Sequence, residues 1–317
     1  MLPFVSTSNH ERRLQIGERD IAVLRGLFES RVMMIAHASA LFFDGHLEYA
    51  KKRLRLLKAE GLIAERERRP NEPSVLRLSR DGLRLLSENG CLIGYPKAAV
   101  ASRERRLSGS DLTLRHELDV LDVRAAFHLA AKKRGDVSVS RFSTWPLLHE
   151  FEARGAEGRC LVKPDGFLRL ESGGRSHAFF LEVDRSTETH DTLVSRASAY
   201  LDHYRSGGFA RRNGSRADEF KKHPFRVLMV FKTAERRNNV AESLLRSPMP
   251  ILSLAWLATL EEVRRNPLGA IWTVPCDYRT VVDMPHYRLR DSIHTASKRS
   301  TERDSLVAAR VPKRALC

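Results

Sequence analysis

The segment LVKPDGFLRLESGGRSHAFFLEVDRSTE, residues 161–188, combines two apolar stretches with acidic residues. Its pattern predicts two neighbouring strands, with Asp165 at the start of one strand and Glu182 and Asp184 at the end of the next. Residues two apart on a strand project from the same face of a sheet. We therefore expect Glu182 and Asp184 to project together, with Asp165 able to face them from the neighbouring strand.

Three carboxylates that converge in this way repel one another, and a hard divalent cation would relieve the repulsion. Oxygen ligands suit Mg²⁺ or Mn²⁺, and a metal held there can bind a scissile phosphate and activate a water. Asp165, Glu182 and Asp184 are therefore predicted to be metal ligands and catalytic residues. The alternative is that they are ordinary strand-end carboxylates paired with arginines.

Nearby cations are predicted to assist this acidic cluster. Lys163 lies two residues before Asp165 in the same predicted strand, so it would share its face and is a candidate catalytic cation. Arg185 and Arg196 are candidates for contacts to DNA phosphates.

The acidic segment lies in a region whose pattern predicts an α/β domain over 111–287. A long helix over 111–134 leads it, and Glu117 on its core-facing side is a candidate outer metal ligand. His116 and Arg124 could equally pair with Glu117 in a structural role. The other elements predicted in this domain are strands over 137–142, 161–170, 177–184, 225–231 and 251–255, helices over 190–204 and 237–245, and a basic surface loop over 205–222.

The preceding part of the chain predicts a separate domain over 18–90. Its elements are, in chain order, helices over 18–28, 32–43 and 46–60, strands over 62–66 and 75–78, and a helix over 79–89. Gly61 ends the third helix, and Asp44-Gly45 forms the turn before it. Three helices followed by a basic hairpin is the plan of a winged helix-turn-helix domain.

The third helix has the two faces that a DNA-reading helix needs. Its inner face is predicted to be Leu47, Ala50, Leu54 and Leu57. The residues predicted to contact DNA, from this helix and from the wing that follows, are His46, Tyr49, Lys51, Lys52, Arg53, Arg66, Arg68 and Arg69. The alternatives are a solvated charged face or a module that docks on protein.

Charge favours nucleic acid as the partner. The chain of 317 residues has 55 Lys and Arg against 39 Asp and Glu, a formal net charge of +16. An excess of this size favours polyanions. A linker is predicted over 91–110, and a basic, disordered tail over 288–317.

Composition also limits the class of protein. Four scattered cysteines, at 91, 160, 276 and 317, have no zinc-site spacing and indicate a reducing compartment. The sequence lacks an apolar run long enough to span a membrane, and residues 1–13 lack the core of a signal peptide. We expect a cytoplasmic protein without a membrane partner.

Pro164-Asp165, followed by Glu182-Val183-Asp184, resembles the PD-(D/E)xK nuclease pattern. More specifically, the chain is similar to the replication-relaxation family, which is linked to MobC-type plasmid relaxases, over residues 18–275. The pieces that carry the resemblance, besides the leading winged helix, are LRHELDVLDVRAAF, PDGFLRL, FFLEVDRSTE, ASAYLDHY, FRVLMVF and NPLGAIWTVP.

The resemblance implies an α+β fold in which a winged helix precedes a restriction-endonuclease-like α/β domain. It also implies metal-dependent nicking in plasmid mobilisation or replication, with Asp165, Glu182 and Asp184 as metal ligands. One departure is that the nuclease pattern has lysine at the position of Asp184. A covalent role for Tyr200 or Tyr204 is disfavoured, because both lie on a helix beside apolar residues.

Three functions follow from these patterns. The leading one is a Mg²⁺- or Mn²⁺-dependent nickase that binds double-stranded DNA at a plasmid origin. The second is a DNA-binding regulator of transcription or replication whose nuclease fold is not catalytic. The third is a scaffold in a mobilisation or defence complex that uses the α/β domain to bind protein. Mobilisation or replication proteins are candidate partners. A homodimer is compatible with each of these functions.

Overall fold

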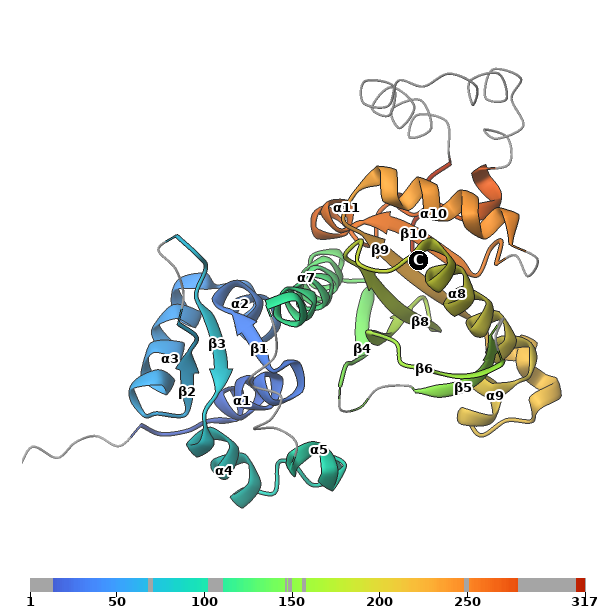
Figure 1. Cartoon of the computed structure of the whole chain (residues 1–317). Coiled ribbons are helices and arrows are strands. Elements are labelled where there is room, and N and C mark those ends of the chain that lie inside the picture. Colours follow the sequence, from blue (N-terminus) through green and yellow to red (C-terminus); the bar gives the residue numbers. More distant parts are fainter. Residues whose placement is uncertain are drawn as a thin grey trace, which may run out of the picture. The chain divides into compact units, whose positions relative to one another are not determined.

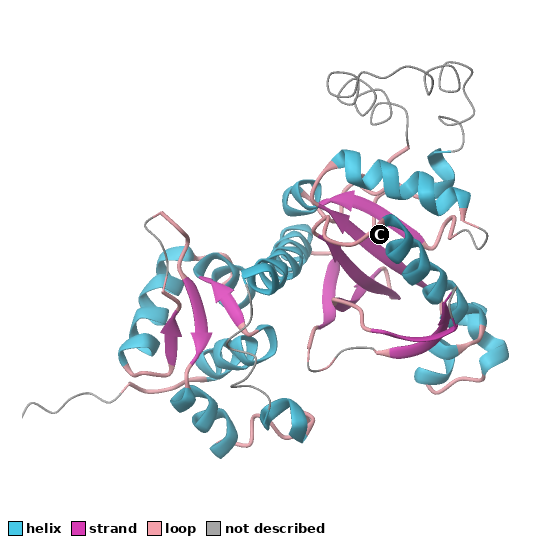
Figure 2. Cartoon of the chain, in the orientation of Figure 1, coloured by secondary structure: helices cyan, strands magenta, loops and turns pink. Residues whose placement is uncertain are grey.

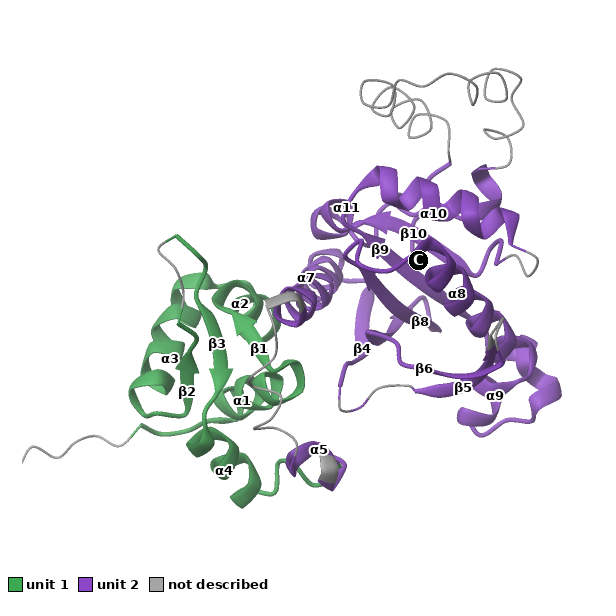
Figure 3. Ribbon diagram, viewed as in Figure 1, with its two compact units in different colours: residues 1–94 green, residues 95–317 purple. Residues whose placement is uncertain are grey.

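The structure is a computed structural model, and it describes residues 14–67, 71–101, 111–145, 147, 150–155, 158–247, 251–278 and 312–316. The chain divides into two compact units, residues 1–94 and 95–317 (Figure 3). Helices combine with one mixed and two antiparallel sheets, which confirms the expected α+β class (Figure 2). In the part of the chain described, no helix is both long and apolar enough to cross a membrane.

The described part of the first unit consists of four helices and one small antiparallel sheet. Its elements are α1 (Glu18–Ser30), β1 (Val32–Met34), α2 (Ile35–Phe42), α3 (Leu47–Ala59), β2 (Ile63–Glu65), β3 (Val75–Leu78) and α4 (Arg80–Glu88) (Figure 1). The strand order is β1-β3-β2. The helices bury one stripe each, as in α3, where Ala50, Leu54 and Leu57 are buried. The turn between α2 and α3 uses Asp44 and Gly45 with positive φ.

The structure corrects two details of the prediction for this unit. Residues 32–43 are not one helix, because Val32–Met34 form β1 and pair with β3. That pairing partner lies more than forty residues away, so helical periodicity could not reveal it. Leu47 is not on the inner face but is 42% exposed at the start of α3.

The second unit is built around a five-stranded mixed sheet. Its elements are α5 (Lys97–Ala101), α7 (Asp111–Arg134), β4 (Val137–Ser143), β5 (Phe151–Gly155), β6 (Gly158–Val162), β7 (Gly166–Ser172), β8 (Arg175–Asp184), α8 (His190–Arg205), α9 (Gly208–Arg212), η1 (Ala217–Lys222), β9 (Phe225–Phe231), α10 (Ala234–Arg246), β10 (Ala255–Thr259), α11 (Leu260–Arg265) and η2 (Pro275–Tyr278).

The order of this sheet is β10-β9-β8-β7-β4. β8, β9 and β10 are parallel, whereas β7 is antiparallel to both β8 and β4. Side chains of α8 pack on one face with Phe167 and Phe180, and those of α7 pack on the other with Leu168 and Leu181. The strand β8 is therefore buried on both faces, which explains its continuous apolar run.

Three predictions for this unit are wrong in detail, and the predicted linker is described only in part. The strand predicted over 161–170 is two strands, β6 and β7, separated at 163–165, where Pro164 lacks the N–H that a ladder needs. The short strand is β10, not 251–255, because pairing with β9 selects Ala255–Thr259. The predicted loop 205–222 contains α9 and η1. The predicted linker contains α5, and its residues 102–110 lie outside the described part of the chain.

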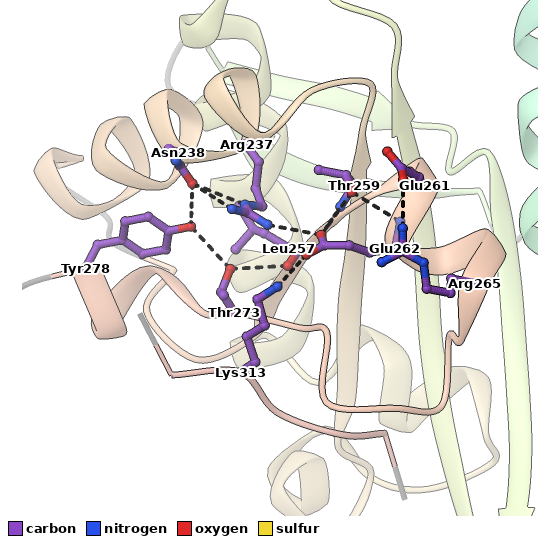
Figure 4. A network of polar contacts seen from close by, with 10 residues as sticks. All are labelled: Arg237, Asn238, Leu257, Thr259, Glu261, Glu262, Arg265, Thr273, Tyr278 and Lys313. Carbon is purple, nitrogen blue, oxygen red and sulfur yellow. Dashed lines mark hydrogen bonds and ion pairs between the residues drawn. The ribbon is translucent and has the colours of Figure 1, made fainter. Parts of the chain in front are cut away.

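The end of the chain also differs from the predicted tail. Residues 312–316 lie against the second unit, where Arg314 bridges to Trp272 and Leu316 is buried. Figure 4 shows Lys313 directed at Glu262, which also pairs with the buried Arg237 at 3.0 Å. The rest of the predicted tail up to 311 lies outside the described residues.

Candidate functional site

Asp165, Glu182 and Asp184 lie on one face of the mixed sheet. In β8 the residues of the same parity as Glu182 and Asp184, such as Phe180, belong to the core under α8. Asp165 directly precedes β7, and its backbone N–H donates to the carbonyl of Leu181 at 3.0 Å. One of its carboxylate oxygens accepts the backbone N–H of Val183 at 2.7 Å. This backbone pairing places Asp165 beside Glu182.

The three acids line a pocket of about 190 Å³ at the end of β8. Its wall also contains cations and one further acid. The lining residues are His116, Lys163, Asp165, Glu182, Val183, Asp184, Arg185, Thr187, Glu188, Leu193, Arg196, Met229 and Phe231.

Glu182 is held by two donors from α8. Tyr200 donates its hydroxyl to Oε1 at 2.5 Å, and Arg196 donates to Oε2 at 2.9 Å. Burial, and then repulsion from Asp165, raise the pKa of Glu182 to about 8. Burial and the bond to Glu182 also raise the pKa of Tyr200 well above its usual value. Glu182 therefore keeps its proton to a higher pH than an exposed glutamate does.

Asp184 and Asp165 have different partners. Arg236, in the first turn of α10, donates Nε to one oxygen of Asp184 at 2.8 Å, and the backbone N–H of Ser186 donates to the other at 3.1 Å. The Nε2 of His116, on α7, lies 2.9 Å from the second oxygen of Asp165. Burial lowers the pKa of His116, but the bond to Asp165 and the negative charges of Asp165 and nearby acids together raise it overall.

The side chains as placed do not form a divalent cation site. Each oxygen of Asp165, Glu182 and Asp184 is within hydrogen-bonding distance of a protein nitrogen or hydroxyl group. Within the described ranges, no group of three or more His, Cys, Asp and Glu side chains could hold a metal. The repulsion that suggested Mg²⁺ or Mn²⁺ is relieved here by Arg196, Arg236 and His116. The metal therefore stays a prediction.

The structure places the other residues predicted for this site, Lys163, Arg185 and Glu117, away from the three acids or beside other partners. Lys163 lies between strands, not on a shared strand face, and its Nζ is 3.8 Å from Glu150. Arg185 forms an ion pair with Asp119 on α7. Glu117 is not among the residues that line the pocket.

The predicted DNA contacts of the first unit separate into exposed and engaged residues. His46, Tyr49 and Lys52 are exposed on α3 or at its start. Lys51 is half-buried and pairs with Glu48 at 2.7 Å. Arg68 and Arg69 lie outside the described residues.

Arg53 faces its own unit. Its Nε donates to Asp20 on α1 at 2.7 Å, and the guanidinium also donates to the carbonyl of Gln15. Burial raises the pKa of Asp20, but the hydrogen bonds from Arg53 and the Gly17 backbone, together with the nearby arginine charges, lower the pKa overall. The Arg53 guanidinium therefore joins α3 to α1. Arg66 bonds through its backbone N–H to Val75 and continues the β2–β3 ladder.

Sequence reasoning missed Arg236 and did not connect His116 with Asp165. Arg236 lies over fifty residues after Asp184, and only the parallel pairing of β8 with β9 brings α10 to the pocket. A usable signal existed, because a helix that follows a parallel strand begins at the carboxyl edge of the sheet.

The model of the replication-relaxation family matches residues 24–217, which is more than half of the chain. No curated protein and no solved structure matches this chain. The matched region extends from α1 of the first unit to the start of η1, and it contains all three acids of the pocket. The chain therefore belongs to the replication-relaxation family.

Proposed function

We propose that this protein binds duplex DNA through α3 of its first unit and acts in plasmid replication or mobilisation. Membership in the replication-relaxation family suggests a role in replication or mobilisation. The observation that carries the DNA proposal is the order of elements, α1-β1-α2-α3-β2-β3, with a tight turn before α3 and a hairpin after it. Winged helix-turn-helix domains have this order of elements. In such domains the second helix of the helix-turn-helix motif enters the major groove.

The side chains of α3 support this role. Its buried stripe fixes the helix to the unit, while His46, Lys52 and Arg55 are exposed. In the part of the chain described, Lys52 and Arg55 form no ion pair. Cations in this state can bind DNA phosphates or base edges without first breaking a contact in the protein.

Binding is tested with the full chain and short duplexes tiled across the DNA that flanks its gene. Replacing Lys52 and Arg55 together by Gln should weaken binding to the preferred duplex by about tenfold or more. The matched control replaces Arg25 and Arg84, exposed on α1 and α4, by Gln. Equal losses in both variants, or no DNA binding by the wild type, would overturn the proposal.

Strand cleavage is a second candidate function, favoured by the convergence of three acids in one pocket. The main proposal does not include it, because those acids are all bound to protein donors. The test is incubation of supercoiled plasmid carrying the preferred duplex with Mg²⁺ or Mn²⁺. Nicking by the wild type that is lost on Asp165→Ala and Glu182→Ala would establish cleavage. Absence of nicking with intact DNA binding would favour the non-catalytic regulator.

A further inference from the structure

Two arginines of the mixed sheet lie directly opposite each other on neighbouring strands. Arg141 of β4 is the register partner of Arg169 of β7. Like charges in this arrangement destabilise a sheet. A third arginine, Arg212 at the end of α9, is close enough that repulsion from Arg141, after burial, lowers its pKa. We call these three residues the arginine cluster.

Within the described ranges, no arginine of the cluster forms an ion pair, although the charge of Glu150 is near enough to Arg212 to act on its pKa. Among the residues that the structure describes, each of its arginines donates only to a neutral oxygen. Arg141 donates to the hydroxyl of Ser143 at 2.7 Å, Arg169 to the amide of Asn213 at 3.2 Å, and Arg212 to the carbonyl of Glu150 at 2.9 Å. Arg185 and Arg196, which line the acidic pocket, and Arg236, which binds Asp184, differ because each pairs with a carboxylate.

The cluster is also held in place. The guanidinium carbons of Arg141 and Arg169 each lie 5.9 Å from the ring centroid of the buried Phe167. The Nε of Arg169 is buried without a hydrogen-bond partner in the structure. Three oriented guanidinium groups with spare donors are suited to phosphate, whose oxygens accept paired N–H groups.

The arginine cluster lies on the same face of the sheet as the acidic pocket of this unit. Arg169 and Phe167 share strand parity with Asp165, so all three project from one face. Four residues of strand span ~13 Å. Along the axis of a B-form duplex, that length corresponds to about four phosphates of one strand. A single strand could therefore contact the cluster while it passes the pocket.

We propose that Arg141, Arg169 and Arg212 bind the phosphodiester backbone of DNA and give the second unit its own DNA contact. DNA is preferred to an acidic protein because its charges are regularly spaced along a strand. This contact does not depend on base sequence, since phosphates carry no direct sequence information. It goes beyond the proposed role of α3 and does not require cleavage in the pocket.

The test measures binding of the full chain to a duplex of unrelated sequence and to a single-stranded oligonucleotide over a range of salt. Replacing the three arginines by Gln should weaken binding by about tenfold or more. The slope of log K against log salt should also fall by about 2 to 3, at roughly 0.7 to 0.9 per phosphate contact. The matched control loses the same charge at exposed sites, through Arg175→Gln, Arg246→Gln and Arg265→Gln.

Further variants separate charge from structure. The triple Lys variant keeps the charge and should retain most of the salt slope. If the triple Gln variant does not fold, Arg212→Gln at the surface should still reduce the slope by about 1. An unchanged slope, or binding of an acidic peptide by the cluster with unchanged DNA affinity, would overturn the proposal.

The two proposals fail differently. The Lys52 and Arg55 variant is expected to lose its preference for one duplex but to keep binding unrelated DNA. This residual, sequence-independent binding should depend on the arginine cluster. If the variant of the arginine cluster binds unrelated DNA as tightly as the wild type does, the cluster proposal is wrong and the proposed role of α3 stands.

Discussion

Glu182 couples the acidic pocket to the stability of the second unit. Its folded-state pKa is raised from 4.5 to about 8. Between these values the folded protein holds a proton that the unfolded chain has lost. The resulting contribution to stability is therefore complete below about pH 4.5, and it is lost as the pH rises through about 8.

Replacing Glu182 by Gln should remove this dependence. The amide resembles the protonated carboxyl in shape, so the free energy of unfolding should change little near pH 5. Above pH 8 the variant should be more stable than the wild type, by an amount on the order of a few kcal/mol. Urea unfolding of both proteins across this range measures the difference. A difference that does not vary with pH would show that Glu182 titrates normally.

At the same scale, strand parity predicts which acids share a face but not what they bind. Two positions of separation place Glu182 and Asp184 together wherever β8 lies. The cations that neutralise them come from α8 and α10, and Arg236 is brought near only by the parallel pairing of β8 with β9. The local sequence around Asp184 does not indicate that Arg236 lies beside it in the folded protein.

Among the elements, α4 shows how closely a helix packs on a hairpin. A Cβ atom on Gly82 would lie 2.2 Å from the carbonyl oxygen of Leu62 and 2.7 Å from a methyl carbon of Leu78. Backbone at this distance cannot move aside without shifting the helix. Glycine is therefore needed here for close approach, although it is a poor helix former.

Gly82→Ala should destabilise the first unit by about 2 kcal/mol, because the clash exceeds the gain of about 1 kcal/mol in helix propensity. Denaturation followed by far-UV circular dichroism measures the change. Arg84→Ala, an exposed change on the same helix, serves as the control and should stay within about 0.5 kcal/mol. A stabilised Gly82→Ala variant would mean that α4 does not pack as described.

For the molecule as a whole, residues 312–316 close the core of the second unit. Leu316 is 1% exposed and belongs to the cluster that contains Trp272 and side chains of α7. Lys313 and Arg314 add ion pairs with Glu262 and Asp277. A segment far along the chain therefore completes a core that begins at α7.

Leu316→Ala should lower the free energy of unfolding of the second unit by about 3 kcal/mol, the usual cost of such a cavity. Tryptophan fluorescence reports this transition, because Trp256 and Trp272 lie in that unit. Leu161→Ala, at a position that is 53% exposed, should cost less than about 1 kcal/mol. Equal costs at both positions would contradict the docking of Leu316.

The sequence by itself determined the elements that local periodicity encodes. The bounds of α7, β9 and β3 agree with those predicted, and the shared face of Glu182 and Asp184 follows from strand parity alone. Tertiary structure decided β1, the exact span of β10 and the docking of residues 312–316. It also decided that arginines, a histidine and a tyrosine bind the acids. In each case the partner lies on a different element of the chain, outside the reach of local periodicity, and the free energy of pairing outweighs the weak local preference.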